Sequence, residues 1–138
     1  MRNYPLKERI AQRIKRSQKE VFLRSDFSDF GGYDQVGRAL KQLINEQQLI
    51  RIGQGLYTRA RPSTVTGEPT IALPGGFKSA SRAALTRLGY KWTANKFEDA
   101  YNSARTTQIP ANAEVVVQGR LSRKIEFGNQ ELQYRVKH

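Results

Sequence analysis

Residues from which chemical sites are built are scarce in this chain of 138 residues. It has no cysteine, which excludes disulfide bonds and thiolate zinc sites and fits the reducing cytoplasm. Its single histidine is the terminal residue, His138, so we expect no metal centre and no acid–base site built on imidazole. No apolar run approaches the roughly 20 residues that span a bilayer. We therefore expect a cytoplasmic protein without a metal, a cofactor or a membrane partner.

Acidic residues are the other shortage. The chain has 12 Asp and Glu against 24 Lys and Arg, which gives a formal net charge of +12. The excess is spread along the chain, because 13 basic and 6 acidic residues precede Pro62 and 11 basic and 6 acidic residues follow it. Nucleic acid is the partner that this balance favours, since each neutralised phosphate releases condensed counterions. An acidic protein or an anionic membrane surface would also be attracted.

The clearest local pattern lies in the middle of the N-terminal half. Apolar side chains recur there at the spacing of one side of a helix, which predicts a helix over 34–46. Two short β-prone runs follow at 49–52 and 56–59. The glycines of Gly53-Gln54-Gly55 between them predict a tight hairpin. A helix followed by a small basic hairpin is the order of a winged helix-turn-helix.

The segment before this helix predicts two further helices and a strand. Pro5 opens a helix that runs to about Arg16 and carries a row of basic residues, for which solvation and phosphate contact both stay open. A β-prone run at 21–23 then precedes a brief helix that Ser25 or Asp26 caps. Three aspartates precede or open predicted helices, and we interpret them as caps in preference to a magnesium site: Asp26, Asp29 and Asp34.

The C-terminal half predicts a second, smaller unit. The turn-forming stretch 61–69 is the expected connector, so we place a winged helix-turn-helix domain at 1–62 and an α+β domain at 63–138. Helices are expected at 79–88 and 95–104. Three β-prone runs then predict a three-stranded antiparallel sheet that the helices cover, and the fold class is α+β. These runs lie at 115–117, 124–127 and 132–136, with the last two facing each other across Gly128-Asn129.

Several short runs in the C-terminal half form a family pattern. They read ARTTQIP at 104–110, VVVQG at 115–119, IEFGN at 125–129 and YRVKH at 134–138. With the winged-helix order before it, this pattern resembles the AbiEi-type antitoxins, which are transcriptional regulators of type IV toxin–antitoxin systems. The resemblance implies an N-terminal DNA-binding domain that represses its own operon at inverted repeats. It also implies a C-terminal domain that neutralises a cognate nucleotidyltransferase toxin.

The outer side of the predicted helix and the hairpin after it supply the candidate contacts to double-stranded DNA. Arg38 and Gln42 lie four positions apart, so both can reach base edges in a major groove, where Arg prefers guanine and Gln adenine. Lys41 and Asn45 are assigned to phosphate, and the hairpin residues to the adjacent backbone or minor groove. The candidates are Gln35, Arg38, Lys41, Gln42, Asn45, Arg51, Gln54, Arg59 and Arg61.

A possible second basic surface accompanies the helix at 79–88, and it either extends the DNA footprint or faces an acidic partner. It consists of Lys78, Arg82 and Arg87. The alternative to a regulator is an antitoxin or adaptor that binds protein and no DNA. We expect no enzyme and no small-molecule substrate, because the carboxylates are interpreted as caps or sheet residues and no usable histidine or cysteine accompanies them.

Overall fold

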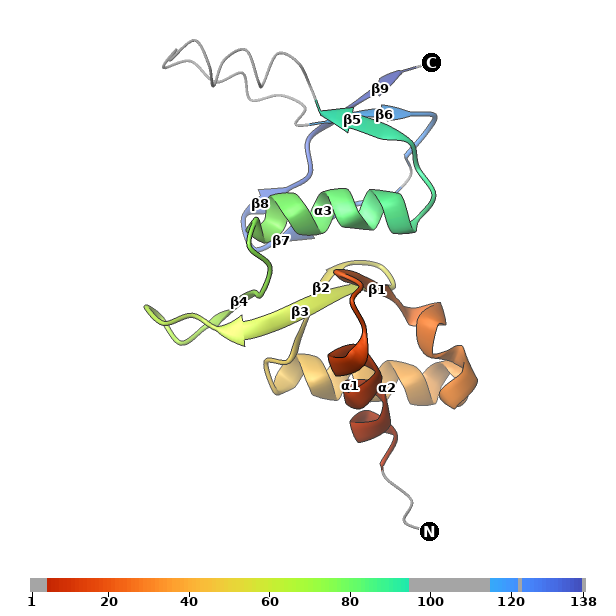
Figure 1. Ribbon diagram of the computed structural model, residues 1–138, viewed down its shortest axis with the longest axis vertical. Coiled ribbons are helices and arrows are strands. Elements are labelled where there is room, and N and C mark those ends of the chain that lie inside the picture. Colours follow the sequence, from red (N-terminus) through yellow and green to blue (C-terminus); the bar gives the residue numbers. More distant parts are fainter. Residues whose placement is uncertain (1–4, 95–114, 122, 138) are drawn as a thin grey trace.

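The computed structural model describes residues 5–94, 115–121 and 123–137 (Figure 1). These residues form a mixed α+β fold, as the sequence predicts. The helices described are α1 (Leu6–Arg16), the 3-10 helix η1 (Arg24–Phe30), α2 (Tyr33–Asn45) and α3 (Gly76–Arg87). The strands described are β1 (Val21–Leu23), β2 (Leu49–Gly53), β3 (Leu56–Pro62), β4 (Pro69–Ile71), β5 (Trp92–Ala94), β6 (Val115–Gln118), β7 (Glu126–Phe127), β8 (Gln130–Glu131) and β9 (Tyr134–Lys137).

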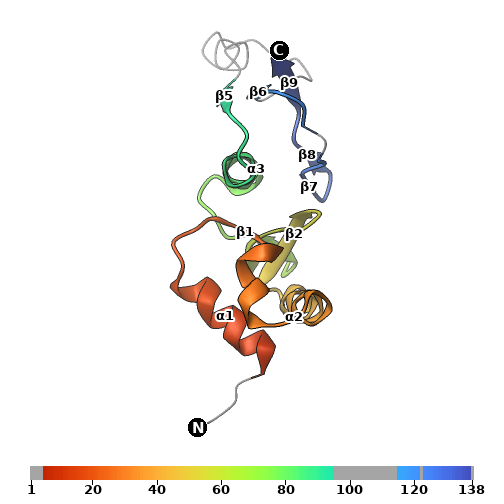
Figure 2. The same ribbon diagram turned by 90° about the vertical axis from the view of Figure 1, so that its right-hand side faces the viewer.

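The N-terminal half is built around an apolar cluster between its helices. α1 buries Ile10 and Ile14, because side chains four positions apart lie on the same side of a helix. They pack with Phe27 of η1 and with the buried side of α2. Figure 2 shows α1 and α2 side by side beneath the strands. The helix predicted at 34–46 is therefore confirmed, with each end one residue earlier.

A small sheet covers these helices. In it β3 pairs antiparallel with β1 on one side and β2 on the other, and the end of β3 pairs with β4. The predicted hairpin is confirmed as β2 and β3, and Gly55 in its turn has a φ of 70°, which favours glycine. The predicted connector at 61–69 is the tip of a second hairpin, where the Ser63 N–H donates to the Glu68 carbonyl over 2.8 Å.

A second apolar cluster contains side chains from both halves of the chain. α3 begins at Gly76, three residues before the predicted start, and places Leu85 in this cluster. Ile52 of β2 and Val117 of β6 belong to it as well. Figure 1 accordingly shows α3 between the N-terminal sheet and the strands β5, β6 and β9. The domain boundary at residue 62 stays a prediction.

The C-terminal strands pair differently from the prediction. β6 pairs antiparallel with β5 and parallel with β9, and β7 and β8 alone form the hairpin predicted across Gly128-Asn129. The expectation that 132–136 pairs with 124–127 was wrong. Leu132 donates its N–H to the Ile125 carbonyl over 2.9 Å and enters the core, after which the chain continues to the edge of β6. Alternation along a strand fixes its two faces but not its partner.

Two predictions fall outside the described ranges, the helix at 95–104 and the run at 104–110. No helix within those ranges is long and apolar enough to cross a membrane.

Candidate nucleic-acid interface

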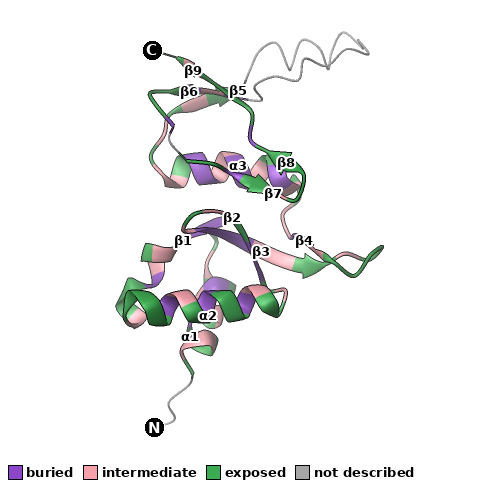
Figure 3. Ribbon diagram, turned by 180° about the vertical axis from the view of Figure 1, so that it is seen from behind, coloured by how far each residue is buried: buried purple, intermediate pink, exposed green. Residues whose placement is uncertain are grey.

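The helix α2 has one buried side and one exposed side (Figure 3). Val36, Leu40 and Leu43 are buried, because they recur at the helical period and pack in the cluster that α1 and η1 share. The opposite side is left to polar residues. All five α2 residues that the sequence singled out are exposed, and we call them the α2 surface: Gln35, Arg38, Lys41, Gln42 and Asn45.

The α2 surface is cationic. It carries Arg38 and Lys41, and the exposed carboxylate of Asp34 lies one turn before Arg38 on the same side of the helix. Glu46 directly follows the helix, but it accepts a hydrogen bond from Lys7 Nζ of α1 over 2.6 Å, which compensates its charge. A surface of this kind attracts a polyanion and holds side chains that can donate to base edges.

The first turn of α2 is capped by a glutamine. Gln35 Oε1 accepts the Gly32 N–H over 3.2 Å and so satisfies a backbone donor at the start of the helix. Asp34, which the sequence assigned to this cap, lies within the first turn, where a carboxylate still complements the positive end of the helix dipole. Although Gln35 is exposed, its side-chain oxygen already accepts a hydrogen bond within the protein.

The turn of the β2–β3 hairpin contacts the C-terminal half of the chain. Gln54 at the turn is exposed, and its backbone carbonyl accepts from Arg123 Nη1 over 2.9 Å. Arg51 is exposed on β2, with Nε donating to the Gly53 carbonyl over 3.2 Å. Arg61 is exposed near the end of β3. Three of the four predicted hairpin contacts thus remain at the surface.

Arg59 is the exception among the hairpin residues. Its Nη2 donates to the carbonyls of Ile14, over 2.8 Å, and of Ser17 at the end of α1. Its guanidinium also lies over the Phe22 ring, 5.3 Å from the centroid. Arg59 satisfies helix-end carbonyls that would otherwise lack donors and fastens α1 to the sheet, and its assignment to DNA stays a prediction.

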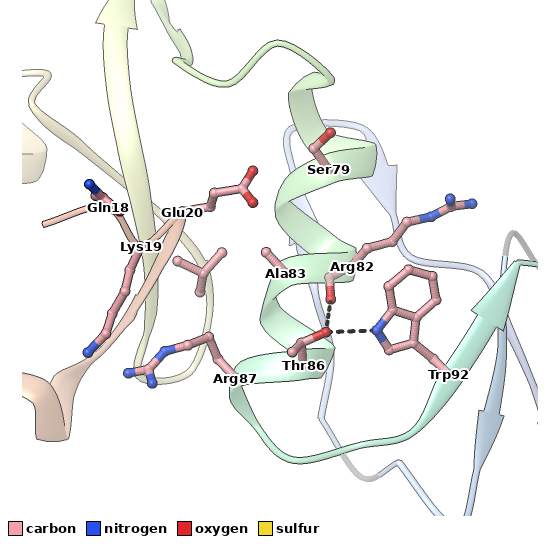
Figure 4. Close-up of a pocket in the computed structure, with 10 residues that line it drawn as sticks. Gln18, Lys19, Glu20, Ser79, Arg82, Ala83, Thr86, Arg87 and Trp92 are labelled. Carbon is pink, nitrogen blue, oxygen red and sulfur yellow. Dashed lines mark hydrogen bonds between the residues drawn. The ribbon is translucent and has the colours of Figure 1, made fainter.

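Two of the basic residues of α3 line one groove (Figure 4). Arg82 and Arg87 point to opposite sides of the helix. The Arg82 guanidinium lies 5.4 Å from the Trp92 ring centroid, in an open groove of about 440 Å³ that α3 forms with the residues leading into β1. Arg87 donates to both carboxylate oxygens of Asp26. Lys78 is exposed, whereas Arg87 is a partly buried ion-pair partner, and the second basic surface stays a prediction.

The aspartates before α2 pair with arginines. Arg13 donates to the two carboxylate oxygens of Asp29 over 2.6 and 2.8 Å, and these hydrogen bonds lower the pKa of Asp29 and raise that of Arg13. Asp26 also accepts the Leu23 N–H over 2.9 Å at the start of η1, which agrees with its predicted capping task. Within the described ranges, no three His, Cys, Asp or Glu side chains gather as metal ligands.

Sequence reasoning missed one pair of residues beside the α2 surface. Tyr33 is 70% exposed, because it is the first residue of α2. The guanidinium carbon of Arg24 lies 3.5 Å from the centroid of its ring. Tyr33 lies three positions before Val36, in line with the buried side of α2, so spacing alone predicts that Tyr33 is buried.

Comparison with protein families finds one that matches residues 9–137, a family of unknown function (DUF6088). The match covers most of the chain, so the protein belongs to this family. Comparisons with curated proteins and with solved structures find no significant match.

Proposed function

We propose that this DUF6088 protein is a DNA-binding transcriptional regulator whose first half is a winged helix-turn-helix. One observation carries the proposal: the α2 surface is exposed, polar and cationic, on a helix whose other side is fixed in the core. The order of α1, β1, η1, α2 and the β2–β3 hairpin supports the winged-helix assignment. The net charge of +12 favours a polyanionic partner.

In the proposed complex α2 lies in the major groove of double-stranded DNA. Arg38 and Gln42 read base edges, while Lys41 and Asn45 contact phosphates. The β2–β3 hairpin serves as the wing and contacts the adjacent backbone or minor groove through exposed residues. These are Arg51, Gln54 and Arg61.

The resemblance to AbiEi-type antitoxins supplies the biological setting that we propose. The protein represses its own operon by binding inverted repeats in the cytoplasm, and its C-terminal half neutralises a nucleotidyltransferase toxin. In this proposal the protein has no catalytic activity, no cofactor and no small-molecule substrate. The antitoxin part rests on the sequence pattern of the C-terminal half and would be supported by a nucleotidyltransferase-like gene beside this one.

Two variants test the DNA-binding role. A duplex is selected from a randomised pool by the wild-type protein, and its affinity is compared with that of a random duplex. Arg38→Ala should cost about 1–3 kcal/mol on the selected duplex and less on the random one, because Arg38 reads a base. Arg51→Ala should weaken both duplexes alike, because its partner is the backbone.

Two results would contradict the proposal. Equal losses on both duplexes with Arg38→Ala would exclude base reading by this residue. Absence of any shift of either duplex by the wild-type protein at low salt would exclude the regulator and support the adaptor that binds protein alone.

A further inference from the structure

Arg24 of η1 reaches across to the first turn of α2. Its Nη2 donates to the Tyr33 carbonyl over 2.7 Å, and its guanidinium stacks on the Tyr33 ring with the carbon 3.5 Å from the centroid. The residue is half-buried, whereas Tyr33 is 70% exposed. A planar cation and an aromatic ring are thus held together at the protein surface.

Gly37 makes room for this guanidinium on α2. A Cβ atom at residue 37 would lie 2.0 Å from Nη2 and 2.8 Å from Cζ of Arg24, so any other residue would displace the side chain. Residue 37 precedes Arg38 and lies one turn before Lys41. Arg24 therefore adds a third cation, from a different helix, along the edge of the α2 surface.

The charge of Arg24 is not used within the described part of the protein. Arg13 and Arg87 each pair with an aspartate. Arg24 instead donates to the backbone carbonyl of Tyr33. A guanidinium has five N–H donors. Nε of Arg24 is buried and has no hydrogen-bond partner among the described residues. Stacking and the carbonyl contact thus hold a cation that pairs with no carboxylate among the described residues.

We propose that Arg24, positioned by Tyr33 and Gly37, binds a phosphodiester of the DNA backbone at the edge of the α2 surface. This inference rests on the proposed function and extends its binding site to η1. Phosphate contacts set the register of a protein on a duplex. Stacking and the carbonyl contact hold the guanidinium in place before DNA arrives, which lowers the entropy lost on binding.

Three variants test this inference on the duplex selected by the wild-type protein, over a series of salt concentrations. Arg24→Gln should weaken binding about tenfold and make the slope of log affinity against log salt shallower by about 1, as expected for one lost phosphate contact. Gly37→Ala keeps every charge but displaces the guanidinium, so affinity should fall although alanine favours the helix. Lys137→Gln removes an exposed cation of β9 as the matched control and should change little.

The outcomes separate this inference from the proposed function. Circular dichroism checks that each variant is folded. If Arg24→Gln does not fold, Gly37→Ala alone tests the inference. If Arg38→Ala weakens binding while Arg24→Gln and Gly37→Ala behave like Lys137→Gln, the inference is wrong and the proposed function stands. If the wild-type protein binds no duplex, both are overturned.

Discussion

Arg87 near the end of α3 donates to both carboxylate oxygens of Asp26 in η1, 61 positions earlier in the chain. The two side chains are only 27% and 18% exposed, and Asp26 also accepts the Leu23 N–H. This ion pair ties the C-terminal half to the segment that leads into α2. The position of η1, and with it that of Arg24, therefore depends on α3.

Arg87→Ala should destabilise the protein by about 2–3 kcal/mol, because Asp26 would remain in a partly buried site without its cation. Urea unfolding measures the change. Lys91→Ala, which removes an exposed cation a few residues later, should stay within about 0.5 kcal/mol. Equal effects of the two substitutions would mean that the ion pair contributes nothing to stability.

The Arg13–Asp29 pair predicts a pH dependence of stability. Hydrogen bonds from Arg13 lower the pKa of Asp29 in the folded protein. The stabilisation is therefore present above the unfolded-state value of about 4 and is lost as the pH falls through the folded-state pKa. The difference in unfolding free energy between the wild-type protein and Asp29→Asn should be constant above about pH 5 and should shrink below it. A difference that grows on acidification would contradict this sign.

Gly53 in the β2–β3 hairpin is expected to tolerate no side chain. A Cβ there would lie 2.8 Å from the Lys124 carbonyl oxygen and 2.9 Å from Leu56 Cδ1. Gly53→Ala should cost about 1–3 kcal/mol in denaturant unfolding, because the C-terminal half would have to shift. Gly32→Ala, where the nearest atom is 3.9 Å away and φ is −67°, should cost less than about 1 kcal/mol. Similar costs at both positions would argue against the contact with residue 124.

Local spacing in the sequence predicts much of the N-terminal half. The period of the apolar residues gives the position of α2, its buried side and therefore the exposure of Arg38, Lys41 and Gln42. The two glycines of the turn give the β2–β3 hairpin in the same way. What these exposed residues bind stays a prediction, because exposure does not identify a ligand.

Contacts between distant segments could not be predicted in this way. Arg59 and Arg87 look like surface cations in the sequence, but their partners lie 42 to 61 positions away and become neighbours only in the fold. The parallel partner of β9 is missed for the same reason, since alternation is identical in parallel and antiparallel pairs. The exposure of Tyr33 could not be predicted either, because α2 begins at that residue and no periodic signal marks a helix start to within one position.

A pair of matched charge reversals tests the central claim most directly. Arg38→Glu with Lys41→Glu changes the α2 surface, and Arg135→Glu with Lys137→Glu makes the same change in net charge on β9, at the far end of the molecule (Figure 1). Fluorescence anisotropy with the selected duplex measures both affinities. We predict a loss of more than about tenfold for the α2 pair and a much smaller loss for the β9 pair. Equal losses would mean that the duplex responds to net charge alone, and the assignment of α2 as the DNA-binding element would be wrong.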